Sequence, residues 1–175
     1  MRVLIVTPLY PPEIANAAVY AKELALRLSK NHEVTVIAYT HLPEEVRGVS
    51  VITIDKQKRL LTRLYAFRKA FAHAVKKTDV VLAINGVSVE LPLLLAFFPK
   101  SVSLIFCIAD VAAHLHGGLI ERLSFARADV VVHELPPRYP EILPFEPEPT
   151  EALTAYEASW VAHLHTLESL FRYAS

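Results

Sequence analysis

Short apolar runs rich in β-branched residues recur along this chain and constrain its fold more than any other feature. Six are present, at 2–7, 33–38, 49–54, 79–84, 101–107 and 128–133. Continuous runs of this kind are typical of strands covered on both faces, as in a parallel sheet. Because helical segments separate most of them, the chain should consist of βαβ units with right-handed crossovers. The predicted fold class is α/β: a doubly wound, mostly parallel Rossmann-like sheet of about six strands flanked by helices.

Helical spacing of apolar residues marks the segments between the runs. Four such segments are present, at 17–30, 58–77, 87–98 and 115–126. In the first, Tyr20, Leu24 and Leu28 fall on one face, as expected for a helix packed on a sheet. Only a loop separates the runs 33–38 and 49–54, so the placement of that strand pair is the least constrained part of the prediction.

The pattern changes at residue 134. Six of the 12 prolines fall within 136–149, and proline lacks an N–H and fixes φ, so this stretch is predicted to be an extended connector. A final helix should begin at about Thr150, a suitable N-cap residue. Its apolar residues recur every three or four positions: Leu153, Tyr156, Trp160, Leu164, Leu167 and Phe171. We expect a domain over 1–135 and a helix over 150–175 that packs back on the sheet or on a second copy.

Composition excludes several classes of protein. The 18 basic and 18 acidic residues give no net charge, so a general polyanion binder is not expected and no nucleic-acid partner is predicted. The single Cys107 cannot form a disulfide within the chain and is expected to pack as a small hydrophobe, which suits a reducing compartment. No apolar run is long enough to span a membrane. The expected location is the cytoplasm.

The opening segment is similar to a known family. It reads VLIVTPLYPPEIANAAVYAKELALRLSKNHEVTVIAY over residues 3–39. The PPEI turn, the helix with Leu24, Ala25 and Leu28, and the run HEVTV resemble the N-terminal, acceptor-side domain of retaining glycosyltransferases with the GT-B fold (the subfamily-4-like N-terminal domain). Looser matches, GVSVITI, TDVVLAINGV and ERLSFARADVVV, extend the similarity to about residue 133.

The tail carries the same resemblance. The run SWVAHL at 159–164 resembles a stretch near the end of such enzymes, where the last helix packs back on the N-terminal domain. The resemblance implies that the C-terminal, donor-binding domain is missing and that the Pro-rich connector replaces it. It implies binding of a sugar or lipid-sugar acceptor, for glycosyl transfer from a nucleotide sugar, with a separate donor-binding subunit. The chain alone would then be an incomplete or inactive enzyme.

The loop after the first run is the first candidate site. By the resemblance, Glu13, Ala15, Asn16 and Ala17 would lie near the phosphates of a nucleotide sugar, where a helix N-terminus favours negative charge. Ala15 and Asn16 occupy the positions of two family glycines, and their side chains add bulk where a diphosphate must approach closely. The alternative interpretation is that Asn16 caps the helix.

The second candidate site lies after the fourth and fifth runs. Asn85 and Gly86 follow one run, and Asp110, His114 and His116 follow the other, so all five could line a crevice at the carboxyl ends of the strands. The family's histidine position is Ala109 here, which argues against ordinary catalysis. Alternatively, the two histidines are exposed, and Asn-Gly makes a turn. A His-x-His pair without a third ligand is poor support for zinc, so no metal and no cofactor are predicted.

Two further interpretations concern partners. Residues 56–77 contain eight Lys and Arg and no acidic residue, with apolar residues at helical spacing. This pattern predicts either a peripheral contact with the inner face of a membrane or a solvated outer face of a helix. The departures at Ala15, Asn16 and Ala109 also favour an alternative function, a non-catalytic binding or scaffold protein derived from a glycosyltransferase. That protein would be a homodimer, because an apolar crevice without its lid should be covered.

Overall fold

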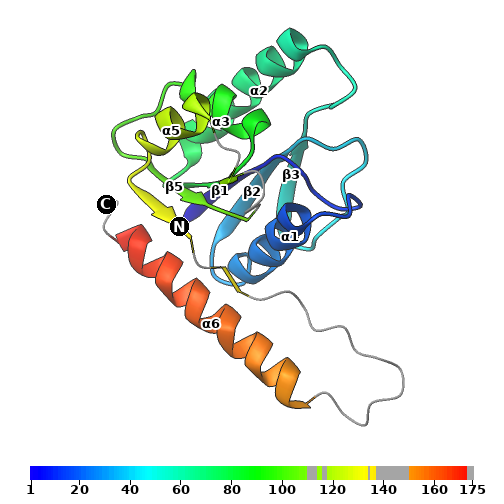
Figure 1. Ribbon diagram of the computed structural model, residues 1–175, viewed down its shortest axis with the longest axis vertical. Coiled ribbons are helices and arrows are strands. Elements are labelled where there is room, and N and C mark those ends of the chain that lie inside the picture. The colour runs from blue at the N-terminus through cyan, green and yellow to red at the C-terminus, as the bar shows by residue number, and fades with distance from the viewer. Residues whose placement is uncertain (110–113, 116–117, 134, 137–149, 173–175) are drawn as a thin grey trace.

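The computed structural model describes residues 1–109, 114–115, 118–133, 135–136 and 150–172. Within these residues, six parallel strands form one sheet in the order β3-β2-β1-β4-β5-β6 (Figure 1). The strands are β1 Arg2–Thr7, β2 Glu33–Ala38, β3 Val49–Thr53, β4 Val80–Ile84, β5 Ser103–Cys107 and β6 Val130–Val132. The predicted Rossmann-like α/β fold is therefore confirmed. The order reverses between β1 and β4, the place where such folds form a crevice.

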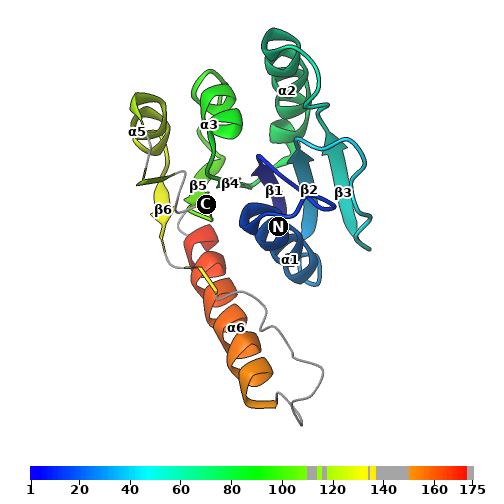
Figure 2. The same ribbon diagram turned by 45° about the vertical axis from the view of Figure 1, so that its right-hand side comes forward.

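Helices cover both faces of the sheet (Figure 2). They are α1 Asn16–Leu28, α2 Leu60–Ala74 with a 3-10 turn Val75–Lys77, α3 Val87–Leu94, α5 Leu119–Phe125 and α6 Thr150–Arg172. One face packs against α1 and α6, and the other packs against α2, α3 and α5. The strand pair that the sequence constrained least lies side by side in parallel, with Val34 opposite Val49. No helix among the described residues is long and apolar enough to cross a membrane.

An apolar layer covers each face of the sheet. Successive residues of a strand point to opposite faces, so each side chain enters one layer or the other. In β1, Val3 and Ile5 belong to the layer under α1 and α6, whereas Leu4 and Val6 belong to the layer under α2 and α3. All four are at most 2% exposed. This double burial explains why the strands read as continuous apolar runs rather than alternating ones.

The C-terminal helix α6 packs back on the sheet of its own chain, which is one of the two arrangements that the sequence left open. The side chains of Trp160, Leu167 and Phe171 are almost fully buried in the layer under α1. The Trp160 ring stacks on Tyr20 of α1 with the ring centroids 5.7 Å apart. The helix therefore covers the half of the sheet face that α1 leaves open.

Polar contacts fix the register of α6 on α1. The Arg27 guanidinium bonds both carboxylate oxygens of Glu157, at 2.8 and 2.7 Å, and lies 5.0 Å from the centroid of the Trp160 ring. The buried Tyr20 hydroxyl is hydrogen-bonded to Nε2 of His163 at 2.8 Å. Burial lowers the pKa of His163 to about 4, so this imidazole is neutral at neutral pH.

Candidate functional site

A cavity of about 730 Å³ opens at the carboxyl edge of the sheet, between α1 and α6. The first turns of α1 supply one wall through Asn16, Val19 and Glu23, and α6 supplies the other through Tyr156 and Trp160. Ala109, Leu135 and Pro136 also line it. The volume is that of a typical small-molecule site, and the lining is mostly apolar with a few polar groups, as such sites usually are. We call it the α1–α6 cavity.

The N-terminus of α1 forms part of this wall and carries no side-chain cap. The N-cap residue is Ala15, whose backbone is extended at φ −153° and ψ 155°. Its carbonyl accepts the N–H groups of Ala18 and Val19. The interpretation that Asn16 caps the helix is wrong, because the helix begins at Asn16 itself. The positive end of the α1 dipole therefore lies at the cavity wall without a capping side chain.

The four residues predicted for the first site separate into two pairs. Ala15 and Asn16 line the α1–α6 cavity. Glu13 instead forms an ion pair with Lys56, in the segment that follows β3. Ala17 is 3% exposed and belongs to the core under α1. Of these four residues, only Ala15 and Asn16 are thus at the cavity, and both carry a side chain.

Asn85 and Gly86 shape the edge of the sheet rather than line the cavity. The Asn85 side chain is buried, and its Oδ1 accepts the Ala109 N–H at 2.9 Å, which ties the ends of β4 and β5 together. Gly86 has a φ of 142°, and a Cβ there would meet Pro8 at 3.1 Å. Its N–H donates to Oε1 of Glu90 at 2.8 Å. The pair joins β4 to α3 through a bend in which Gly86 is the N-cap of the helix, and its positive φ favours glycine.

His114 lies on the other side of the sheet from the cavity. Its Nδ1 is 2.8 Å from Oε1 of the buried Glu121, and its ring stacks on Phe125, which packs in the layer under α2 and α3. Glu90 is also buried in this region, where burial raises its pKa and the neighbouring Glu121 raises it further. The structure thus does not bring His114 to the cavity. The predicted Asp110 and His116 lie outside the described residues.

The sequence prediction missed most of the cavity wall. Tyr156 and Trp160 were assigned to packing, which is correct, because both are at most 4% exposed, but the edges of their rings also line the cavity. Val19 and Glu23 follow Asn16 at helical spacing, and that spacing was the available signal. Among the described residues, no group of three His, Cys, Asp or Glu side chains could hold a metal ion. The site is therefore an apolar and aromatic cavity with Asn16 and Glu23 as polar side chains.

These features define a Rossmann-like α/β protein with a cavity at the carboxyl edge of its sheet. No protein-family model matches the chain. No curated protein sequence matches it either. Among solved structures it is similar to a D-isomer specific 2-hydroxyacid dehydrogenase from Xanthobacter autotrophicus Py2, in complex with NADPH and MES, with a TM-score of 0.36 and 17% identity. The alignment covers 97% of this chain and 67% of that chain. A likeness this weak carries no argument about function.

Proposed function

We propose that this chain binds a sugar-bearing ligand in the α1–α6 cavity, as the acceptor-side half of a glycosyl-transfer system of the GT-B type. The observation that carries the proposal is the position of the cavity. It opens at the carboxyl edge of a doubly wound sheet, between a helix N-terminus and two aromatic side chains. The resemblance of residues 3–39 to GT-B acceptor-side domains supports the same assignment.

The cavity lining suits a sugar ring. The side chains of Asn16 and Glu23 can bond the hydroxyl groups of a pyranose. Tyr156 and Trp160 are 4% and 3% exposed, so they add only the small apolar part of their rings that the packing of α6 on α1 leaves uncovered. The N-terminus of α1 favours an anionic group. However, the side chains of Ala15 and Asn16 keep a diphosphate from the close backbone approach that glycine would allow. We therefore favour the acceptor over the nucleotide sugar as the ligand of this cavity.

A second chain would supply the donor. Large apolar side chains are exposed at or just before the first turns of helices that begin at the carboxyl edge: Ile14, Val87 and Leu119 are each at least 63% exposed. Apolar surface gathered beside a cavity is typical of a contact with another protein. In the proposed assembly, the partner holds the nucleotide sugar, and the glycosyl group passes from its diphosphate to a hydroxyl of the ligand in the cavity.

One observation favours the alternative, a binding protein without turnover. Among the described lining residues, Glu23 supplies the only carboxylate, and it is already paired with Arg27 at 3.1 Å. The lining position at which the family carries histidine is Ala109. A cavity with these groups offers binding contacts but no side chain placed for proton transfer.

Calorimetric titration with a panel of simple glycosides and nucleotide sugars tests the binding function. We expect one site per chain and a preference for glycosides. Val19→Arg should weaken binding at least about tenfold, because Val19 is half exposed at the cavity wall and the longer cationic side chain would fill it. Leu26→Arg is the matched control: Leu26 is also exposed, seven residues further along the same helix, and does not line the cavity.

The outcomes separate the two functions. Binding that Val19→Arg abolishes, with product formation from a nucleotide sugar, supports glycosyl transfer. Binding without product, even beside a donor-binding chain, supports the non-catalytic protein. Silence across the panel, or binding that Val19→Arg leaves unchanged, refutes the assignment of the α1–α6 cavity as the ligand site.

A further inference from the structure

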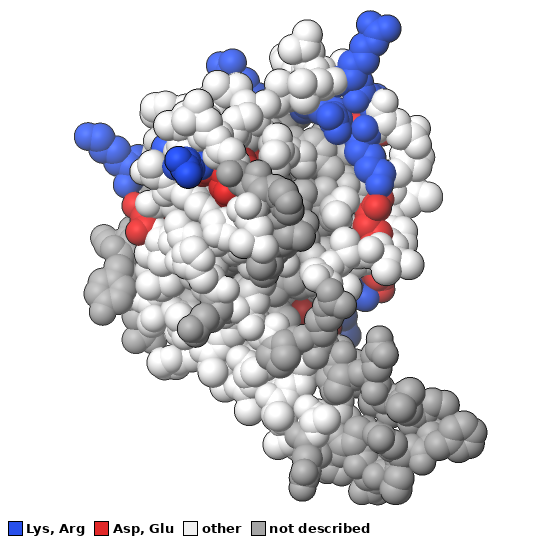
Figure 3. Space-filling view, viewed as in Figure 1, with Lys and Arg blue, Asp and Glu red and all other residues white. Residues whose placement is uncertain are grey.

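The segment around α2 concentrates positive charge. Residues 56–77 contain eight Lys and Arg and no Asp or Glu. Among the described residues, the only ion pair that involves this segment joins Lys56 to Glu13. Of the other seven cations, Arg63 is half-buried with its Nε enclosed, and the remaining six are exposed and available to an external anion. Figure 3 shows Lys and Arg side chains reaching outward at the upper right, over the region of α2.

The helix also exposes apolar side chains on its outer face. Phe67 and Phe71 point into the core and are 1% exposed. On the other side, Leu61 is 79% exposed and Tyr65 is 70% exposed. Arg68 follows these two residues at helical spacing, so all three share one face. The outer face of α2 is thus both apolar and basic. A helix face that contacts only water needs no exposed leucine or tyrosine.

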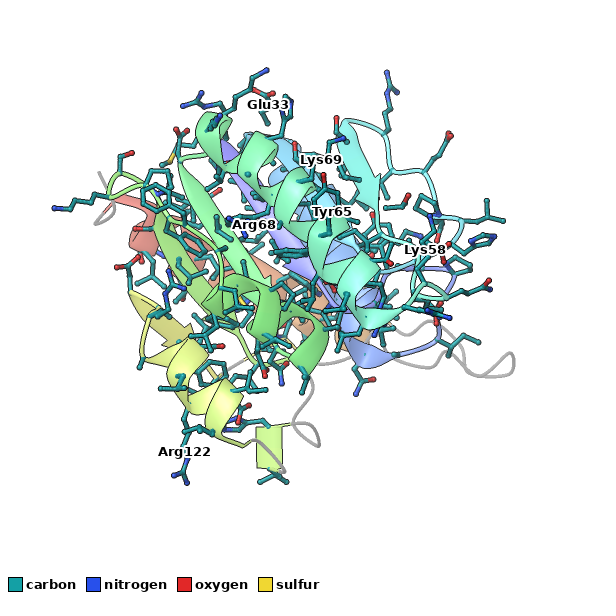
Figure 4. All side chains as sticks on the ribbon, turned by 90° about the horizontal axis from the view of Figure 1, so that it is seen from above. Glu33, Lys58, Tyr65, Arg68, Lys69 and Arg122 are labelled. Carbon is teal, nitrogen blue, oxygen red and sulfur yellow. The ribbon has the colours of Figure 1, made fainter. Side chains whose placement is uncertain are left out.

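Exposed basic residues surround these apolar side chains. Lys58, Arg68, Lys69 and Lys76 are four of them. Figure 4 shows Lys58, Tyr65, Arg68 and Lys69 distributed along α2, whereas Arg122 lies apart on α5. We call Lys58, Leu61, Tyr65, Arg68, Lys69 and Lys76 the α2 surface.

We propose that the α2 surface docks on a membrane that contains anionic lipids. Cations attract the headgroups of such a membrane, and the leucine and tyrosine enter the boundary between headgroups and acyl chains. Tyrosine is enriched at that depth because its ring is apolar and its hydroxyl is polar. A nucleic acid would satisfy the cations through its phosphates but would offer no apolar medium to Leu61. The combination of both kinds of side chain therefore favours lipid.

The surface is preformed, which helps weak contacts to add up. The aromatic stack of Tyr39, Phe67 and Phe71 fixes α2 on the sheet, with neighbouring ring centroids 6.1 and 5.7 Å apart. The helix therefore does not need to fold on the membrane, and docking avoids the entropy cost of ordering its backbone. This inference concerns a surface away from the α1–α6 cavity and does not depend on its ligand.

Vesicle flotation of the full chain tests the proposal. The probes are vesicles of phosphatidylcholine alone and of phosphatidylcholine mixed with phosphatidylserine or phosphatidylglycerol. We expect flotation only with the anionic mixtures, decreasing as sodium chloride is added. Arg68→Gln with Lys69→Gln should lower the partition coefficient roughly 30-fold, because two cations are lost. Leu61→Ser with Tyr65→Ser should lower it at least about tenfold at unchanged charge.

A matched control comes from α5. Leu119→Ser with Arg122→Gln removes an exposed leucine and an exposed arginine from another face and should leave flotation unchanged. A retained far-ultraviolet circular dichroism spectrum and unfolding transition show that each variant is folded.

Three outcomes overturn the proposal: absence of flotation with anionic vesicles, flotation that the control variant reduces as much as the α2 variants, or flotation that Leu61→Ser with Tyr65→Ser leaves unchanged. A duplex DNA of random sequence, titrated in parallel, identifies the remaining alternative. Tighter binding to DNA, dependent on Arg68 and Lys69 but not on Leu61, would assign the α2 surface to a nucleic acid instead.

Discussion

At the scale of single residues, Gly86 is the position where the backbone tolerates least change. Its φ of 142° is strained for any other residue, and an added Cβ would meet Pro8 at 3.1 Å. Gly86→Ala should therefore lower the free energy of unfolding by about 2 kcal/mol. Gly118→Ala is the control, since no heavy atom lies within 4 Å of its added Cβ. Urea unfolding of both variants measures the difference, and equal effects would contradict the strain.

His163 makes the docking of α6 sensitive to acid. Its pKa is lowered to about 4 by burial, from about 6.5 in an unfolded chain. Between these values the unfolded chain binds the extra proton, so the free energy of unfolding rises with pH there and falls as the pH is lowered. This contribution is fully present above about pH 6.5 and is lost progressively toward about pH 4.

The predicted loss is measurable by urea unfolding at about pH 7.5 and about pH 5, where His163 alone should cost about 2 kcal/mol. The His163→Gln variant keeps a polar group that does not titrate. Over the same pH interval, its free energy of unfolding should therefore fall by about 2 kcal/mol less than that of the unaltered chain. Because the other histidines are unchanged in the variant, their contributions to the pH dependence cancel in this comparison. An NMR titration gives a second readout: the His163 ring should stay neutral well below the pKa of an exposed histidine. A normal titration midpoint would contradict its burial.

The candidate site could be predicted only where it depends on local sequence. Ala15 and Asn16 lie at the cavity because the strand-turn-helix order places the residues before α1 at the carboxyl edge. His114 does not, because its position depends on Glu121, a partner on a later helix. Glu13 likewise depends on Lys56, 43 residues away. Neither pair lies within one helix or strand, so neither contact leaves a periodic signal in the sequence.

At the scale of elements, the strands were predictable because burial on both faces requires continuous apolar runs. Helix ends were not. The segment predicted as a helix over 87–98 ends at Leu94 in the structure. Its last carbonyls accept bonds from Arg127, whose guanidinium reaches the carbonyl oxygens of Leu93 and Ala96 at 3.0 Å each. A cap that comes from the turn after α5 cannot be read from the sequence of α3 itself.

The same scale holds a prediction about α6. Trp160 is 3% exposed, stacks on Tyr20 and lies under the Arg27 guanidinium. Trp160→Ala should lower the free energy of unfolding by about 3–5 kcal/mol, since it removes the contacts of the indole with Tyr20 and Arg27 and leaves a cavity. The neighbouring Val161 is 64% exposed, so Val161→Ala should change it by less than about 0.5 kcal/mol. Denaturant titration of the two variants measures these changes. Similar changes in the free energy of unfolding would mean that α6 does not pack on α1 through Trp160.

At the scale of the whole molecule, α6 closes a face that the rest of the chain leaves open. Leu82, Ile105 and Cys107 are at most 1% exposed and belong to the layer that α6 covers. Deletion of residues 150–175 should expose this layer, so the shortened chain should bind the dye ANS and lose its cooperative thermal transition. Addition of a peptide with the sequence of residues 150–175 should reverse both changes. A shortened chain with an unchanged transition would show that the sheet is stable without α6.

The expected homodimer stays a prediction, and the exposed apolar residues indicate where it would form. Val87 is 63% exposed and Leu119 is 71% exposed, and both begin helices at the carboxyl edge, the side that a second GT-B lobe would cover. If a second copy covers it instead, sedimentation equilibrium should detect a concentration-dependent dimer. Val87→Arg with Leu119→Arg should weaken it at least about tenfold, because two buried cations would face each other across the two-fold axis.

The control for that measurement lies at the opposite end of α3. Leu95 and Phe97 are 66% and 84% exposed, but they follow the helix at the other edge of the sheet. Leu95→Arg with Phe97→Arg adds the same charge and should leave the dimer intact. If only the control variant dissociates the dimer, the dimer contact lies at the amino edge of the sheet. A monomer at every accessible concentration would leave the carboxyl edge to a different chain, and that result would favour the two-chain glycosyl-transfer system over the self-associating scaffold.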